Sequence, residues 1–206
     1  MRAEDGEKIR AFVAIELPEQ ALVHLAGVVG RLHDANLRVV RTSSPAGIHL
    51  TLKFLGDISQ QQLAPIENAL RTALAEHGPF RLTLGEPGVF PNARRPRVLW
   101  VGVNGDVGAL EAIAGAVEEA LEPLGFPRDK RGFNAHLTVA RIRDGTPAGE
   151  RQRATEALHT KTDAPTIEID VNAVSLMRST LHPTGATYDC LVSFHLKEGY
   201  RKERKT

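Results

Sequence analysis

The sequence predicts an α+β fold of two lobes, with mainly antiparallel sheets and outer helices around a central cleft. Both halves of the chain share one order of strands and helices, around a strand with the pattern His-Leu-Thr-aliphatic, at residues 49–52 and 136–139. The 206 residues, 42% of them hydrophobic, suffice for one large domain or two fused lobes. We therefore expect a single bilobal domain with a pseudo-twofold axis. Its lobes span about 10–95 and 96–198, and either lobe can contribute a strand to the sheet of the other. A basic tail follows at 199–206.

The first half is expected to fold as strand, helix, strand, helix and strand. Apolar residues that alternate with polar ones favour strands, apolar residues at helical spacing favour helices, and Gly or Pro marks the ends. On this basis strands are expected at 10–17, 48–55 and 80–84, and helices at 19–33 and 59–77, with Ser59 as the N-cap of the second helix.

The second half repeats this alternation. It follows a segment rich in Gly, Pro, Asn and Arg at 85–96, which is expected to be a crossover loop. Strands are expected at 97–103, 133–141, 166–177 and 186–196, and helices at 106–124 and 147–159. Two facing halves of this kind would bring the two motif strands together at the pseudo-twofold axis, with both histidines lining one cleft.

Charge and hydropathy narrow the class of protein. The formal net charge of +1 argues against a strongly basic binder of long nucleic acids, but basic residues flank the second motif at 128–131 and 141–143. This clustering favours a phosphate-bearing ligand that binds locally. No apolar run is long enough for a membrane span, and the charged N-terminus lacks a secretory signal. The single Cys190, expected in the core, allows no internal disulfide. We expect a cytoplasmic protein that does not act at a membrane.

The paired motif suits phosphodiester chemistry. Imidazole titrates near neutral pH, so one histidine can act as base while the other acts as acid. A spacing of two residues along a strand sets each imidazole about 6–7 Å from the threonine hydroxyl on the same face, which spans a phosphate. We interpret His49 and His136 as the catalytic pair, and Thr51 and Thr138 as donors to the phosphate oxygens. The symmetry of the motifs leaves open which histidine is the acid.

Two cations are candidates for stabilising the charge that develops on the phosphate. Lys53 shares a strand face with His49 by alternation, whereas Phe54 belongs to the apolar face. Arg141 follows the second motif, but strict alternation puts it on the face opposite His136. It reaches the cleft only if the strand bends or ends there.

Other classes of site lack their sequence signatures. Neither motif is accompanied by His-x-His, His-Glu-x-x-His or an Asp/His cluster, so no metal is expected. No Gly-x-Ser-x-Gly elbow occurs, no activating pattern accompanies Cys190, and the glycine patterns that bind nucleotide cofactors are missing. We therefore expect no cofactor.

The chain resembles the 2H phosphoesterase superfamily and, within it, the RNA 2′,3′-cyclic phosphodiesterases, long called 2′-5′ RNA ligases. The matching residues cover nearly the whole chain and lie at 10–18, 49–56, 90–92, 96–100, 133–141, 175–179 and 185–188. Family members usually have Pro before the second motif histidine, where this chain has Ala135. This departure alters backbone stiffness more than chemistry.

The resemblance implies metal-independent hydrolysis of a terminal RNA 2′,3′-cyclic phosphate to a 2′-phosphomonoester. By the same resemblance, His49 is the proton donor to the leaving 3′ oxygen and His136 is the base that activates water. The implied partner is an RNA with a single-stranded 2′,3′-cyclic phosphate end, tRNA fragments included. We expect the protein to be a monomer. Two alternatives stay open: 2′-5′ ligation with a 5′-hydroxyl in place of water, and a non-catalytic module that binds RNA or nucleotides.

A terminal base could also be held by stacking, because an unstacked base can lie on an aromatic ring beside a basic rim. Phe133, which follows Arg128 closely, is the candidate platform. A core position at the start of a strand is the alternative for this phenylalanine.

Overall fold

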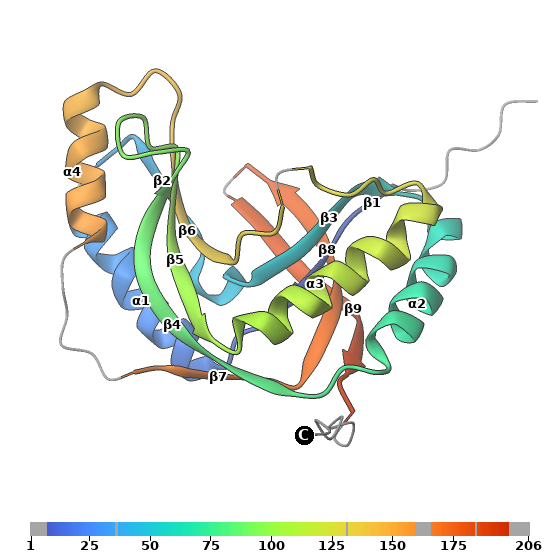
Figure 1. Cartoon of the computed structure of the whole chain (residues 1–206). Helices are drawn as coiled ribbons and strands as arrows, with labels where there is room; N and C mark the ends of the chain where they lie inside the picture. The colour runs from blue at the N-terminus through green and yellow to red at the C-terminus, as the bar shows by residue number, and fades with distance from the viewer. Residues whose placement is uncertain (1–7, 36, 131, 160–165, 184, 198–206) are drawn as a thin grey trace, which may run out of the picture.

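The strands form one curled, entirely antiparallel sheet (Figure 1). The computed structural model describes residues 8–35, 37–130, 132–159, 166–183 and 185–197. Within these residues the strands are β1 (Ile9–Ile15), β2 (Val40–Thr42), β3 (Leu50–Ile58), β4 (Phe80–Phe90), β5 (Val98–Gly105), β6 (His136–Ile142), β7 (Glu168–Val171), β8 (Ala173–His182) and β9 (Gly185–His195). Their order is β7-β4-β5-β6-β3-β1-β8-β9, and β2 pairs with β6.

The two sheets that the sequence predicts are therefore joined edge to edge. The junction lies between β3 and β6, which pair through Leu50 and Leu137 alone. Each of these leucines directly follows a motif histidine, so equivalent residues of the two halves meet at the junction. An antiparallel pair of equivalent residues is the arrangement that a twofold axis produces, and the predicted α+β fold with pseudo-twofold symmetry is confirmed.

The helices cover the outer side of the sheet in two pairs (Figure 1). They are α1 (Glu19–Asp34), α2 (Gln60–Leu74), α3 (Val107–Leu121) and α4 (Ala148–Leu158), with short 3₁₀ turns η1 (Pro45–Gly47) and η2 (Glu122–Leu124). Helix α1 packs against α4 and β6, whereas α3 packs against α2 and β3. Each half of the sheet is thus covered by one helix from each half of the chain. Strands are exchanged as well, because β8 pairs with β1 and β4 pairs with β5.

Most elements lie where the sequence predicts them, and Ser59 caps α2 through the capping box it forms with Gln62. The predicted loop at 85–96 is wrong in its first half, because β4 continues to Phe90 through an irregular register at Leu84–Pro87. The predicted strand at 166–177 is two strands, β7 and β8. Cys190 is exposed on the edge strand β9, not in the core.

Buried apolar side chains from both halves merge into one main cluster between the sheet and the helices. Fully buried members include Leu25 of α1, Leu70 of α2, Ile113 of α3 and Leu158 of α4. None of the helices in the described part of the chain is both long and apolar enough to cross a membrane. The tail at 199–206 and Arg131 lie outside the described residues.

Candidate active site

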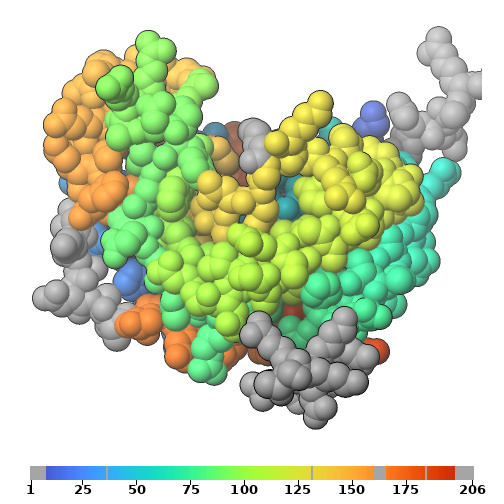
Figure 2. All heavy atoms as spheres, viewed as in Figure 1, coloured from blue at the N-terminus to red at the C-terminus, as the bar shows by residue number. Residues whose placement is uncertain are grey.

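Both motifs line one groove on the inner side of the curled sheet. The groove has a volume of about 570 Å³, and its lining includes all four motif side chains, His49, Thr51, His136 and Thr138. The space-filling view shows a recess between the two halves of the molecule (Figure 2). The predicted catalytic pair and the two predicted phosphate donors are therefore brought together, as the symmetry of the motifs implies.

Each motif strand contains a β-bulge at the same distance from its histidine. In β3, Val13 pairs with Lys53 and Ala14 pairs with Thr51, which leaves Leu52 as an extra residue. In β6, Leu99 pairs with Ala140 and Trp100 pairs with Thr138, which leaves Val139 as the extra residue. Leu52 and Val139 are each the third residue after the motif histidine. A bulge shifts the alternation by one residue, so the side chains beyond it change faces.

The bulges decide which side chains enter the groove. Phe54 and Arg141, each five residues after a motif histidine, both line it. Arg141 is therefore in the groove although strict alternation points it away, and Phe54, predicted for the apolar face, is 70% exposed there. The symmetric positions thus hold a cation in one half and an aromatic ring in the other.

Lys53 does not face the groove, and this prediction is wrong. The bulge turns its side chain to the buried side, where only 5% of it is exposed and it forms an ion pair with Glu118 of α3. Its ammonium group also donates a hydrogen bond of 2.9 Å to the carbonyl of Pro127. Lys53 therefore ties β3 to α3.

The predicted base platform is also absent from the groove. Phe133 is half-buried and packs against the main core, as in the alternative reading of its position. Arg128 is paired with Glu122 at 2.9 Å and lies near Glu119, on the outer helical side. The carboxylates at the end of α3 hold this arginine, so it does not reach the groove lining.

The two histidines are held in the same tautomer by the same kind of contact. Nδ1 of His49 lies 2.8 Å from the carbonyl oxygen of Gly47, and Nδ1 of His136 lies 2.8 Å from that of Asn134. A carbonyl oxygen only accepts, so Nδ1 is the protonated nitrogen in both rings. Nε2 of each ring is consequently left for proton transfer with a ligand in the groove.

Aromatic rings surround the two imidazoles unequally. His49 stacks on Phe12 with ring centroids 4.5 Å apart, and it forms a T-shaped contact with Tyr188 at a centroid separation of 4.9 Å. His136 meets Phe90 edge-on at 5.0 Å. Burial lowers the pKa of His49 below its usual value, and this outweighs the opposing effects of the Gly47 hydrogen bond and of Glu16. In the free protein His49 therefore favours its neutral form.

Glycines give these aromatic rings their space. A Cβ atom at Gly88 would lie 2.3 Å from the indole of Trp100, its partner across the β4–β5 pair. A Cβ atom at Gly47 would lie 3.1 Å from the ring of Tyr188. Tyr188 contacts His49, and Trp100 packs beside both Phe90 and His136. Each motif histidine is thus backed by an aromatic ring that rests on a glycine.

Two arginines face each other across the rim of the groove. Arg41 of β2 pairs in register with Arg141 of β6, and both line the groove. Neither forms an ion pair with any carboxylate in the described parts of the chain, in contrast to Arg81, Arg97 and Arg178. Like charges directly across a strand pair are unfavourable, so this arrangement favours an anion in the groove.

Comparison with known proteins agrees with this geometry. The sequence profile of the 2′-5′ RNA ligase superfamily matches residues 11–183. The chain belongs to this superfamily. A relative named RNA 2′,3′-cyclic phosphodiesterase, from Methanothermobacter thermautotrophicus, is 32% identical over 189 residues, which are 92% of this chain and 100% of the relative. A relative of the same name from Thermus thermophilus is 32% identical over 201 residues, covering 95% and 94% of the two chains.

Solved structures show the same fold. A crystal structure from Thermus thermophilus superposes with a TM-score of 0.73 at 26% identity and covers 91% of this chain and 98% of that chain. Apo E. coli LigT superposes with a TM-score of 0.68 at 22% identity and covers 94% and 100% of the two chains. The family that the paired motifs indicate is thereby confirmed.

Within this superfamily fold, several groove residues lie outside the two motifs and were not predicted. Arg10 and Phe12 come from the first strand, Arg41 and Ser43 from the segment before η1, and Tyr188 from β9. Phe12 and Tyr188 lie in stretches that carry the family resemblance, and that was their only signal in the sequence. No sequence signal marked Arg41 as a groove residue, because β2, the strand that carries it, is only three residues long and shows no alternation.

Proposed function

We propose that this chain hydrolyses the 2′,3′-cyclic phosphate at the end of an RNA to a 2′-phosphomonoester, without a metal ion. The observation that carries the proposal is the pair of motif imidazoles, which keep Nε2 for a ligand, in one groove with both motif threonines. Arg41 and Arg141 line the same groove, and neither is ion-paired among the described residues. The relatives named RNA 2′,3′-cyclic phosphodiesterase match the chain over nearly its full length, which supports the same activity.

The reaction needs one proton removed and one supplied. Nε2 of His136 accepts a proton from water as the water oxygen attacks phosphorus. Protonated His49 donates a proton from Nε2 to the 3′ oxygen as the bond between phosphorus and that oxygen breaks. The product keeps the phosphate on the 2′ oxygen. Because Nδ1 of each ring is bound to a backbone carbonyl, both proton transfers use Nε2.

Negative charge on the phosphate increases in the transition state. The hydroxyls of Thr51 and Thr138 donate to the non-bridging oxygens from opposite sides, and the Arg141 guanidinium provides a positive charge at the same face. Arg41, across from Arg141, extends this positive charge to the rim. The arrangement stabilises a pentavalent phosphate more than the singly charged substrate.

The assignment of acid and base follows the family resemblance. The lowered pKa of His49 makes it largely neutral before substrate binds. A bound phosphate places a negative charge beside the ring, which raises its pKa and favours the protonated form that donates. A group whose pKa is lowered also gives up its proton readily once the 3′ oxygen departs.

The test uses a short RNA ending in a 2′,3′-cyclic phosphate, with chelator present, and identifies the product by mass and by phosphatase and nuclease mapping. A 2′-phosphate end is expected. His49→Ala and His136→Ala should each reduce turnover by about 10²–10⁴-fold while the thermal unfolding transition is retained. His195→Ala is the matched control, because His195 is exposed on β9 and does not line the groove.

The remaining activities give different results in the same assay. Ligation would yield a 2′-5′ linkage when a 5′-hydroxyl RNA is added at high concentration. A binding module would retain RNA affinity in both alanine variants, with no turnover in the parent. Unaltered RNA in the presence of folded parent protein would refute the hydrolase.

A further inference from the structure

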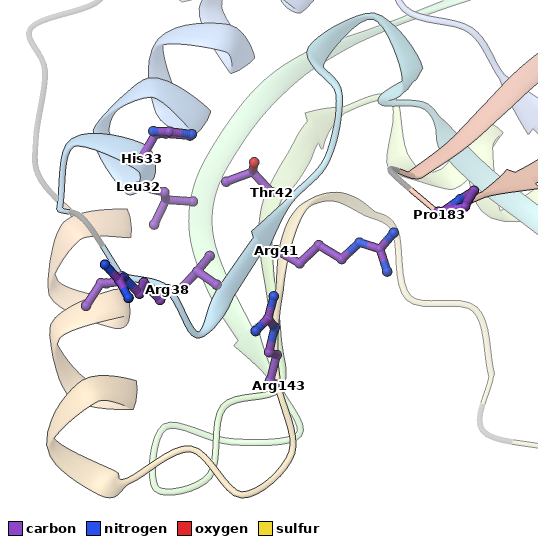
Figure 3. A pocket seen from close by; sticks show the side chains of 9 residues that line it. Leu32, His33, Arg38, Arg41, Thr42, Arg143 and Pro183 are labelled. Carbon is purple, nitrogen blue, oxygen red and sulfur yellow. The ribbon is translucent and has the colours of Figure 1, made fainter.

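A second cavity lies beside the groove and is strongly basic. Its volume is about 630 Å³, and its lining includes three arginines and a histidine, namely Arg38, Arg41, Arg143 and His33. Buried Leu32 and Leu37 contribute an apolar wall. Figure 3 shows Arg143 at the end of β6 extending toward β2, from which Arg41 reaches in the direction of Pro183.

Among the residues that the structure describes, the arginines of this second cavity have no neutralising partners. No carboxylate is part of its lining, and none of its three arginines forms an ion pair within the described ranges. The carboxylate next in sequence to Arg143 is Asp144, and this group is paired with Arg97 instead. Concentrated positive charge without acidic neighbours costs folding energy and is compensated when an anion binds.

The second cavity borders the groove at β2. Arg41 and Thr42 line both spaces. Arg41 also pairs in register with Arg141, and Arg143 lies two residues further along the same strand direction. Arg141 lines the groove, Arg41 lines both spaces, and Arg143 and Arg38 line the second cavity. We call these four residues the arginine track.

We infer that the second cavity binds a backbone phosphate of the RNA strand on the 5′ side of the cyclic end. This inference rests on the proposed function. A 2′,3′-cyclic phosphate is the 3′ terminus of its strand, so the rest of the RNA leaves the groove through the 5′ oxygen of the terminal nucleotide. The arginine track provides such a path, because Arg41 and Thr42 line both the groove and the second cavity. Short oligonucleotides are therefore the preferred substrates over cyclic mononucleotides.

The experiment compares kcat/KM for a 2′,3′-cyclic mononucleotide and for oligoribonucleotides of two to five nucleotides with the same cyclic end. In the parent protein KM should fall once the strand is long enough to reach the second cavity. Arg38→Gln and Arg143→Gln should each raise KM for the longer substrates about tenfold, as expected for loss of one charged contact, and leave mononucleotide hydrolysis within twofold. For the longer substrates, the slope of log KM against log salt should decrease by about 0.7 for each lost phosphate contact.

Arg153→Gln is the matched control, because this substitution removes the same charge. Arg153 itself is exposed on α4 and lines neither cavity. A direct measurement separates this inference from the proposed function: fluorescence anisotropy of a 5′-labelled oligoribonucleotide ending in a 2′-phosphate, which requires no turnover. Weaker binding in Arg38→Gln and Arg143→Gln, but not in Arg153→Gln, supports the second site. Unchanged binding and unchanged KM for the longer RNAs overturn it, even if the parent hydrolyses every substrate. Equal losses on the mononucleotide also overturn it, since they place the effect in the groove.

Discussion

Leu50 and Leu137 are directly paired where β3 meets β6, and they are equivalent residues of the two halves. Continued by one residue each way, this register sets His49 across from Thr138 and Thr51 across from His136. By this extension of the register, each motif histidine lies opposite the threonine of the other motif. A phosphate at the junction therefore meets one imidazole and one hydroxyl from each side, which is the arrangement that the proposed reaction needs.

Arg141 and Lys53 follow the two motifs, and we predict opposite consequences when each is replaced. Arg141→Gln removes one positive charge from the groove and should lower kcat/KM by about 10–100-fold, with the midpoint of urea unfolding nearly unchanged. Lys53→Met leaves the partly buried Glu118 carboxylate without its partner and should lower the free energy of unfolding by about 2 kcal/mol. Its kcat/KM per folded molecule should stay within twofold of the parent value.

The reverse outcome would contradict the bulge geometry. If Lys53→Met abolished hydrolysis in folded protein while Arg141→Gln retained it, the lysine and not the arginine would face the phosphate. Steady-state kinetics and urea unfolding on the same preparations distinguish the two cases.

Much of the site could be predicted from sequence, because His49, Thr51, His136 and Thr138 recur in matched strands, and duplication with antiparallel pairing brings matched strands together. The positions after the motifs could not. Alternation predicts faces only as long as every residue is paired, and one extra residue in each strand reverses the faces of Phe54 and Arg141.

The helices show a similar division. The capping box at Ser59 and the apolar spacing of the helices depend on residues close together in sequence, so both were predictable. The packing of α1 against β6 and of α3 against β3 depends on the curl of the whole sheet, so no local sequence pattern predicts it. The three-residue strand β2, which supplies Arg41, is too short to give a periodic signal.

Ser43 holds the bulge in β6, and its replacement should weaken substrate binding. Its hydroxyl donates to the carbonyl of Thr138 at 3.0 Å, and its backbone N–H donates to the carbonyl of Val139 at 2.8 Å. Ser43→Ala removes the first bond, worth about 1 kcal/mol, and loosens the strand segment that aims Arg141 into the groove. We expect KM to rise several-fold with a smaller change in kcat.

A double-mutant cycle checks this role. If Ser43 acts by positioning Arg141, Ser43→Ala should add little to Arg141→Gln, because the group it positions is already gone. Fully additive losses in kcat/KM would show instead that Ser43 acts on the substrate independently of Arg141.

Tyr188 packs against the ring of His49 in a T-shaped contact, and its removal should shift the pH dependence of hydrolysis. Burial lowers the pKa of His49, so exposure to water in Tyr188→Ala raises that pKa toward the usual value. The limb of the kcat/KM profile that reports His49 should then move to higher pH. NMR titration of the histidine ring protons measures the same shift directly. Tyr188→Phe keeps the ring and should leave the His49 limb unchanged. An unaltered profile in Tyr188→Ala would exclude burial by this ring as the cause of the lowered pKa.

Gly88 is required for space and not for backbone conformation, which gives a prediction with a clean control. Its cross-strand partner Trp100 lies over it, so the Cβ of Gly88→Ala must displace the indole by a large part of an ångström. Overpacking of this kind costs about 1–3 kcal/mol of unfolding free energy. Displacement of Trp100 also disturbs Phe90 and His136, so kcat should fall, whereas a purely structural glycine would change stability alone.

Gly115→Ala on the exposed side of α3 adds the same methyl group to open space and should stabilise the protein by about 0.5–1 kcal/mol without changing kcat. Urea unfolding together with steady-state kinetics measures both quantities, and a Gly88→Ala variant as stable and active as the parent would mean that Trp100 does not support His136.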